Sequence, residues 1–233
     1  MIPWLESGTH FPPIESALTE PDGLLAAGAD LSSARLLTAY RSGIFPWYNS
    51  GQPVLWWSPD PRTVLFPAEF RMPRSLVKRL RRRDYEIRVD TAFEAVMHAC
   101  AAPRSDGAGT WVTPEMIAAY CELHRLGHAH SVETWINGEL AGGLYGIALG
   151  RAFYGESMFA RVADASKIAL AHLVRRLEHQ QFGIIDCQMN TAHLARFGAR
   201  EIPRREFSQR LVELVNYPQT ADVWRFNDEP ATW

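Results

Sequence analysis

The segment from residue 131 to 189 constrains the fold most, because its spacing of polar and apolar residues switches between strand and helix periods. Three consecutive runs predict antiparallel strands: 131–136, 139–149 and 151–158. Asn137-Gly138 joins the first two, and this dipeptide favours the tight turn of a β-hairpin. An amphipathic helix over 165–180 and a strand over 183–189 are predicted to follow.

The strand predicted over 183–189 carries an acid and an amide among aliphatic residues. Strand side chains alternate between faces, so Asp186 and Gln188 are predicted to share one face while Ile185 and Cys187 take the other. Polar groups at the carboxyl end of a strand are a frequent location for sites in α/β folds. The alternative is that Asp186 is only a cap or turn ligand.

Glu156 is a second acid in a predicted strand. Alternation over 153–159 places it with Tyr154 and Met158, on the face opposite Phe153. Two interpretations follow: a strand-end carboxylate paired with a nearby Arg or Lys, or a carboxylate that faces Asp186 across adjacent strands of a cleft. Two such carboxylates would attract a cationic substrate such as an amine.

Shorter elements complete the predicted secondary structure. Helices are expected over 31–41, 74–83, 91–100, 113–126 and 190–197, and strands over 85–89 and around Ile202. Asp30 or Ser32 is expected to cap the first helix, and Asp90 or Thr91 the third. Gly198 is expected to end the last one.

Alternation of helix and strand predicts an α/β (α+β) fold. We expect a small N-terminal domain over 1–61, rich in Pro, Gly and Trp, and a larger domain over 62–233. Pro59 and Pro61 bracket Asp60 and restrict the backbone on both sides of this boundary. The hydrophobic fraction of 47% and charged fraction of 21% are those of an ordinary globular protein.

Charge is distributed unevenly. The net charge of −2 does not itself predict a nucleic-acid partner, yet residues 71–83 hold seven cations and no acid: Arg71, Arg74, Lys78, Arg79, Arg81, Arg82 and Arg83. A solvated helix face and a phosphate-binding surface are both open interpretations. Trp111, which ends the small-residue loop over 102–110, is either a packing residue or a platform for a base.

The sequence gives little indication of a disulfide framework, a membrane span or a metal site. Three widely spaced cysteines predict free thiols in a reducing compartment, and no run of about 20 apolar residues predicts a membrane span. We therefore expect a cytoplasmic protein, as a monomer. His124, His128 and His130 lack a matching set of Cys or carboxylate ligands, so no metal site is predicted.

The central strands and helices resemble the N-acetyltransferase (GNAT) fold. In those enzymes a Gly-rich loop after the third strand binds the pyrophosphate of coenzyme A through backbone N–H groups. The corresponding loop here, FARVADASK over 159–167, has no glycine. No cofactor is therefore expected, and another ligand is expected in the cleft.

Ordered motifs carry a closer resemblance, over about residues 11 to 207. They read PDGLLAAGADLS, YRSGIFPWY, LWWSPDPR, GTWVT, FYGESMF, ASKIAL, IDCQ and FGAREIPRREF. Together they resemble the leucyl/phenylalanyl-tRNA-protein transferases. The resemblance implies a small N-terminal domain and a GNAT-like domain whose cofactor cleft receives the aminoacylated 3′ end of a tRNA.

The same resemblance implies a reaction and a set of residues. Leu or Phe, and less readily Met, would pass from aminoacyl-tRNA to the N-terminal Arg or Lys of a protein, creating an N-degron for proteolysis. Asp186 and Gln188 would form the catalytic centre, with Glu156 beside the reacting groups and Trp111 against the terminal adenosine. The donor side chain would contact a pocket of Leu144, Phe153, Met158, Leu170, Leu177 and Ile185, and the tRNA the cations Arg74, Lys78, Arg79, Arg81, Arg82 and Arg83.

Our hypothesis for the chemistry is that Asp186 accepts a hydrogen bond or proton from the acceptor's α-amine while Gln188 orients the reactants. An α-amine has a pKa of roughly 7.7 to 8.0, so a weak base suffices. Strand alternation turns Cys187 away, so no thiol acyl-enzyme is expected. Two alternatives remain open: an acetyl-CoA-dependent N-acetyltransferase, which needs a Gly-rich loop at 159–167, and a non-catalytic RNA-binding module, which would tolerate Asp186→Ala.

Overall fold

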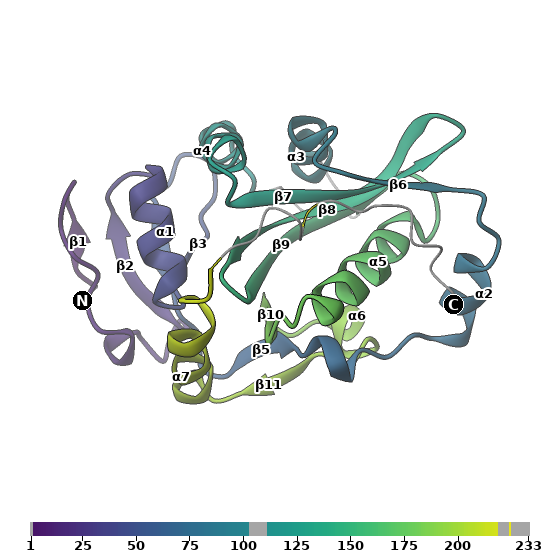
Figure 1. Cartoon of the computed structure of the whole chain (residues 1–233). Helices are drawn as coiled ribbons and strands as arrows, with labels where there is room; N and C mark the ends of the chain where they lie inside the picture. Colours follow the sequence, from purple (N-terminus) through teal and green to yellow (C-terminus); the bar gives the residue numbers. More distant parts are fainter. Residues whose placement is uncertain (1, 103–110, 219–223, 225–233) are drawn as a thin grey trace.

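The computed structural model describes residues 2–102, 111–218 and 224, so the expected loop before Trp111 lies mostly outside the described residues. Two sheets organise the molecule (Figure 1). The smaller sheet has the strand order β1-β2-β4-β3, with β1 at Trp4–Leu5, β2 at Leu24–Gly28, β4 at Leu55–Trp57 and β3 at Phe45–Pro46. Beside it lies α1 (Ser33–Arg41), which begins where the Ser32 hydroxyl accepts a hydrogen bond from the Arg35 N–H at 3.4 Å.

The larger sheet contains the predicted meander. Its order is β11 (Arg200–Ile202), β5 (Arg62–Leu65), β10 (Ile184–Gln188), β9 (Ala152–Ala160), β8 (Glu139–Leu149), β7 (Ala129–Ile136) and β6 (Glu86–Val89). Asn137 and Gly138 have φ values of 53° and 78°, which the favoured hairpin turn requires. Strands β7, β8 and β9 pair antiparallel, so the predicted meander is confirmed.

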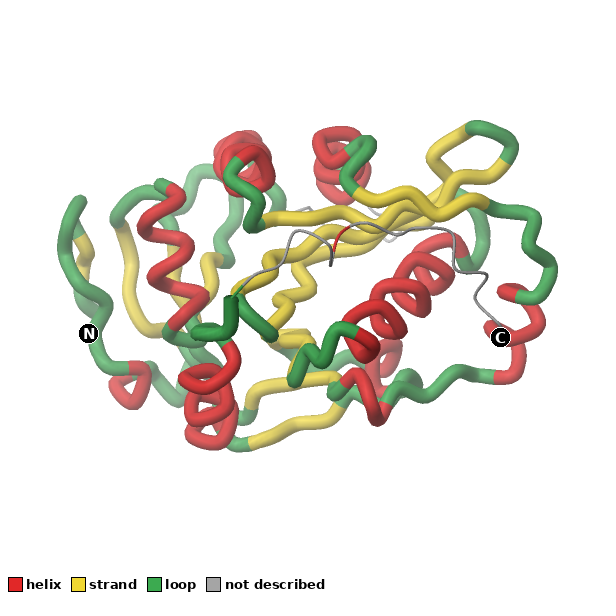
Figure 2. Tube along the Cα trace, viewed as in Figure 1, coloured by secondary structure: helices red, strands yellow, loops and turns green. Residues whose placement is uncertain are grey.

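Helices cover both faces of the larger sheet (Figure 2). On one face lie α3 (Phe93–Ala101) and α4 (Pro114–Arg125), and on the other lies α5 (Ala165–His179). The remaining helices are α2 (Arg74–Leu80), α6 (Ala192–Ala195), α7 (Arg204–Leu214) and the short turns η1 (Ile14–Ser16) and η2 (Pro67–Glu69). The mixed α/β class predicted from the sequence is therefore confirmed.

The connection from β9 through α5 to β10 creates the feature that positions the site. β10 returns parallel to β9, as in the GNAT arrangement, but the two strands pair only as far as Tyr154 and Asp186. Beyond that pair β9 continues along β8, whereas β10 ends at Gln188. Glu156 and Gln188 thus project from two strands that have stopped pairing with each other.

A bulge in β9 changes which side chains share a face. Tyr145 of β8 pairs with Ser157 while the next residue, Gly146, pairs with Gly155, so Glu156 is an extra residue on β9. The prediction that Met158 shares the face of Glu156 is therefore wrong, because the bulge inverts the alternation. A Cβ on Gly146 would lie 2.4 Å from the Phe153 ring, which explains the glycine opposite the bulge.

The predicted cap of α3 is also wrong. Ala92 occupies the N-cap position, and its N–H donates to Oε1 of the buried Glu133 at 2.8 Å. The Thr91 hydroxyl donates to the other oxygen of Glu133, and Asp90 accepts from the Ser131 N–H at 2.8 Å. A carboxylate on β7, distant in sequence, thus replaces the local cap.

One apolar cluster crosses the predicted domain boundary. It contains Leu25 and Trp56 of the smaller sheet together with Val64 and Tyr154 of the larger one. The change of sheet falls between β4 and β5, close to Pro61. Because the core is continuous there, the division into domains over 1–61 and 62–233 stays a prediction.

Candidate active site

Asp186, near the end of β10, is paired with Arg62 of the adjacent strand β5. The guanidinium Nε donates to Oδ1 at 2.8 Å, and Nη2 donates to Oδ2 at 2.6 Å. Arg62 is 1% exposed and Asp186 is 0% exposed. This two-point contact fixes the plane of the carboxylate as well as its position.

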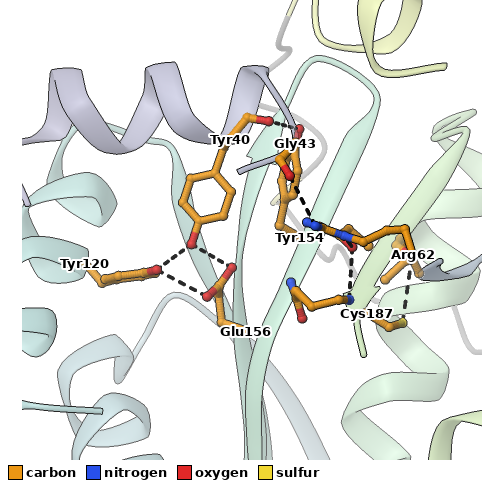
Figure 3. A network of polar contacts seen from close by, with 10 residues as sticks. Tyr40, Gly43, Arg62, Tyr120, Tyr154, Glu156 and Cys187 are labelled. Carbon is orange, nitrogen blue, oxygen red and sulfur yellow. Dashed lines mark hydrogen bonds and ion pairs between the residues drawn. The ribbon is translucent and has the colours of Figure 1, made fainter. Parts of the chain in front are cut away.

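Aromatic rings and a carbonyl hold the Arg62 side chain. Its guanidinium carbon lies 4.7 Å from the ring centroids of both Phe45 and Phe207, a distance typical of cation–π contacts. Nη1 donates to the carbonyl oxygen of Gly43 at 3.1 Å (Figure 3). Arg62 therefore connects β3, β5, α7 and, through Asp186, β10.

Gln188 ends β10 in a left-handed conformation with φ 57°. A register shift between Asp186 and Gln188 makes Cys187 the extra residue, so simple alternation no longer fixes the direction of Gln188. Its main-chain N–H donates to Asp186 Oδ1 at 3.0 Å. The hydrogen-bond network orients its amide nitrogen toward the carbonyl oxygens of Gly155 and Cys187, each at 3.1 Å, so the side chain bridges the separating strands.

Glu156, the extra residue of β9, contacts two tyrosine hydroxyls. The Tyr40 hydroxyl of α1 lies 2.8 Å from Oε1, and the Tyr120 hydroxyl of α4 lies 3.2 Å from Oε2. The two hydroxyls also contact each other. Figure 3 shows the two rings converging on the carboxyl from different elements. We call these three side chains the Glu156 ring.

Burial shifts the acidity of the groups in this region. Desolvation by burial, aided by the charge of Asp186 and opposed by the two tyrosine hydrogen bonds, raises the pKa of Glu156 to about 8. Burial and the nearby Glu156 also hold the pKa values of Tyr40 and Tyr120 well above their ordinary range. Glu156 therefore exchanges its proton near neutral pH.

Cys187 has the surroundings of a packing residue. Its partly buried side chain packs against the apolar cluster on the α5 side of the sheet, which contains Ile185. Burial, and secondarily the charge of Asp186, raises the pKa of the thiol. A protonated thiol is a poor nucleophile, so the geometry gives no support to a covalent intermediate.

The structure brings together the apolar residues expected to bind the donor side chain. Five of the six are buried members of the cluster on the α5 side of the sheet, and the partly buried Met158 packs against them: Leu144, Phe153, Leu170, Leu177 and Ile185, with Met158. Met158 joins this cluster because of the bulge at Glu156. Trp111 is half-buried and packs against the other cluster, on the α3 and α4 side.

Most of the predicted basic surface is exposed. Arg74, Lys78, Arg81, Arg82 and Arg83 all reach solvent on α2 and the turn after it. Arg79 differs, because its guanidinium is ion-paired with Asp84 and lies 5.7 Å from the Tyr85 ring centroid. The assignment of Arg79 to tRNA binding stays a prediction, and its ion pair with Asp84 distinguishes it from the other five cations.

Sequence patterns missed Arg62, Tyr40 and Tyr120. A buried acid in an apolar strand needs a counter-charge, and Arg62 is the cation that opens the apolar run of β5. That requirement could have indicated Arg62. Nothing in the local pattern of α1 or α4 distinguishes their tyrosines from core residues. Within the described ranges no group of three or more His, Cys, Asp or Glu residues could hold a metal ion, and no helix is long and apolar enough to cross a membrane.

The mixed α/β fold places two carboxyl groups, those of Glu156 and Asp186, close to the point where β9 and β10 separate. A family model described as leucyl/phenylalanyl-tRNA protein transferase matches residues 64–212, and a model of that family's N-terminal domain matches residues 29–60. The chain therefore belongs to the leucyl/phenylalanyl-tRNA-protein transferase family, which is a family of aminoacyltransferases.

Curated relatives with that family name cover nearly the whole chain. The protein of Nitrosospira multiformis is 64% identical over 98% of this chain and 99% of its own length. That of Nitrosomonas europaea is 64% identical over 97% of this chain and 96% of its own length. That of Laribacter hongkongensis is 60% identical over 99% of this chain and 100% of its own length.

Proposed function

We propose that this enzyme transfers Leu or Phe, and less readily Met, from aminoacyl-tRNA to an N-terminal Arg or Lys of an acceptor protein, which marks that protein for degradation. The observation that carries the proposal is the 64% identity to a named transferase over 98% of the chain. Peptide-bond formation from an ester needs no covalent enzyme intermediate, which agrees with the raised pKa of the half-buried Cys187 thiol. We place the protein in the cytoplasm, as a monomer without a cofactor.

Asp186 acts as a positioning residue in this proposal. The earlier hypothesis that it takes a proton directly from the acceptor amine fits the geometry poorly, because its carboxylate is 0% exposed and binds Arg62 at both oxygens. It acts instead through Gln188, because the Asp186 carboxylate accepts a hydrogen bond from the main-chain N–H of Gln188. The side-chain N–H groups of Gln188 are directed at the carbonyl oxygens of Gly155 and Cys187, so its amide oxygen, lying where β9 and β10 separate, accepts a hydrogen bond from the attacking amine.

Donor selection is assigned to the apolar cluster on the α5 side of the sheet. Its members offer no charged partner, so the donor side chain must be apolar. One methylene in such a pocket changes binding by only about 1–3 kcal/mol. Leu, Phe and Met are therefore expected to overlap as donors.

The exposed cations of α2 and its following turn are assigned to the tRNA backbone, and Trp111 to the terminal adenosine. Phosphate contacts make affinity fall with salt, by about 0.7 to 0.9 logarithmic units per contact for each tenfold increase. Charge reversal at Lys78 should therefore weaken tRNA binding and reduce this slope. The same change at the ion-paired Arg79 is confounded by its bond to Asp84.

A transfer assay tests the proposal. Leu-tRNA or Phe-tRNA carrying a labelled amino acid is incubated with the enzyme and peptides that begin with Arg, Lys or Ala and are otherwise identical. Label is expected on the Arg and Lys peptides and not on the Ala peptide. Equal labelling of the Ala peptide would contradict the acceptor assignment, and no labelling of any peptide would contradict the reaction.

A further inference from the structure

The Glu156 ring contains three contacts among three groups, and the count of protons in it depends on the state of the carboxyl. Tyr40 and Tyr120 each contact Glu156, and their hydroxyls contact each other. Each tyrosine supplies one proton, so an ionised Glu156 leaves one contact without a hydrogen. A protonated Glu156 supplies the missing one, and each group then donates once and accepts once. The ring is therefore built to receive one proton.

The Glu156 ring is more accessible than the neighbouring ion pair between Arg62 and Asp186. Asp186 is 0% exposed and is ion-paired with Arg62, whereas Glu156 is half-buried. Glu156 also lies beyond the last residues at which β9 and β10 pair. Of the two carboxylates on this face, Glu156 is thus the one that a substrate amine can reach.

Several elements place polar or charged groups around Glu156. These are Tyr40 from α1, Tyr120 from α4, Tyr145 from β8, Tyr154 within β9, Asp186 from β10 and Arg62 from β5. Arg62 is already neutralised by Asp186. The two hydrogen-bonded tyrosines are therefore the neighbours that adjust the proton affinity of Glu156 through direct contact.

We propose that Glu156 is the proton acceptor of aminoacyl transfer, and that Tyr40 and Tyr120 set its proton affinity. The inference rests on the proposed function. The neutral α-amine of the acceptor attacks the ester carbonyl carbon, forming a C–N bond. Glu156, as a carboxylate, takes the proton that the attacking nitrogen loses. When the C–O bond breaks, the carboxyl returns that proton to the ribose oxygen, so Glu156 ends as the carboxylate with which it began.

The proton affinity of Glu156 suits this role. Its pKa of about 8 lies close to the roughly 7.7 to 8.0 of an α-amine, so neither direction of transfer is strongly uphill. An ordinary exposed glutamate, with a pKa of 4.5, would be a far weaker base. Because only the ionised carboxyl can act, the rate of transfer should rise as pH increases through this range.

Removing one hydroxyl tests the inference. We would measure single-turnover transfer of Phe to a saturating Arg peptide between pH 6 and 9.5, subtracting uncatalysed ester hydrolysis, for wild type, Tyr40→Phe and Tyr145→Phe. The Tyr40 hydroxyl stabilises the carboxylate, so Tyr40→Phe should move the midpoint to higher pH by about one unit. Tyr145→Phe is the matched control, because its buried hydroxyl has no hydrogen-bond partner among the described residues, so its midpoint should not move.

The acceptor amine titrates identically in all three reactions, so a difference between midpoints belongs to the protein. An unchanged midpoint in Tyr40→Phe, or an equal shift in Tyr145→Phe, would overturn the inference even if both variants transfer Phe. If wild type transfers nothing to the Arg peptide, the proposed function fails instead.

Replacing the acceptor group itself gives the second measurement. Glu156→Gln keeps the shape of the side chain but cannot take the proton, and the single-turnover rate should fall by about 10²-fold or more. The dissociation constant for Phe-tRNA should stay within about threefold, and Glu156→Asp should recover part of the rate. A Glu156→Gln enzyme with the wild-type rate would contradict the inference.

Discussion

Two carboxylates lie on one face of adjacent strands, and their partners differ in kind. Asp186 faces a guanidinium that binds both of its oxygens, with aromatic rings around that cation. Glu156 faces two hydroxyls and carries no ion pair with them. The first arrangement matches charge with charge, whereas the second accommodates a carboxyl in either protonation state. The partners therefore separate an anchor from a group able to exchange a proton.

The difference also affects how each site depends on the rest of the fold. Arg62 links β10 to Gly43 and to the rings of Phe45 and Phe207, so the ion pair is part of the packing between the sheets. A buried pair of this kind is weak support for stability, but breaking it by removing one partner is costly. Removing one member of the Glu156 ring leaves no unpaired charge when the carboxyl is protonated, because all three groups are then neutral.

Loss of the Arg62 charge should have the largest effect. Arg62→Met leaves the Asp186 carboxylate buried without its counter-charge, and the free energy of unfolding should fall by about 3–5 kcal/mol. Urea unfolding at pH 7 measures this change. The double variant Arg62→Met/Asp186→Leu removes both charges and should recover most of the loss. A double variant as unstable as the single one would show that packing, and not charge, dominates at this position.

Replacing Glu156 with a neutral residue should raise the free energy of unfolding, by an amount that depends on pH. Between its ordinary value of 4.5 and about 8, the folded protein keeps the proton that the unfolded chain has released. The unfolded state then binds fewer protons, so wild-type stability falls as pH rises through this interval. Glu156→Gln lacks this loss. Its free energy of unfolding relative to wild type should therefore rise by about 2 kcal/mol from pH 5 to pH 8, allowing for partial exposure of the side chain.

Thermal or urea unfolding of both proteins at pH 5, 6.5 and 8 checks this dependence. A constant difference in unfolding free energy across the three values would mean that Glu156 is ionised throughout, and would remove the contrast with Asp186.

The aromatic cover of Arg62 should contribute a smaller amount. Phe207→Leu removes one of the two rings that face the guanidinium, and the coupling between Phe207 and Arg62 in a double-mutant cycle should be about 1 kcal/mol. Phe197→Leu is the control, since Phe197 is 2% exposed and stacks on Phe70 instead. Equal coupling of Arg62 to both phenylalanines would attribute the effect to general packing.

Local patterns predicted the parts of the fold that local forces determine. The meander, the hairpin turn at Asn137 and the cap of α1 depend on neighbours within a few residues. The first two were predicted correctly, and Ser32 was one of the two caps expected for α1. The bulge at Glu156 depends on β8 pairing across the sheet, so alternation misassigned Met158. The cap of α3 failed for the same reason, because Glu133 supplies it from another strand.

The site shows the same division. Asp186 and Glu156 stood out as acids in predicted strands, and both lie on one face near the end of the β9–β10 pairing. Their partners did not stand out: Arg62 is 124 residues from Asp186 in sequence, and Tyr40 is 116 residues from Glu156. Contacts over such separations arise only once the sheet and helices pack. The sequence therefore indicated where the carboxylates lie and left their different surroundings undetermined.

Cys187 provides the smallest expected effect and the sharpest check on the absence of a covalent step. It lies between Asp186 and Gln188 in sequence, yet its thiol packs against the apolar cluster and its pKa is raised by burial. Cys187→Ala should therefore keep the single-turnover transfer rate within about twofold, with under ~1 kcal/mol lost in stability, as for a small hydrophobic side chain. A rate loss comparable with that of Glu156→Gln would mean that the thiol participates, and that proton exchange at Glu156 is not the only chemistry on this edge of the sheet.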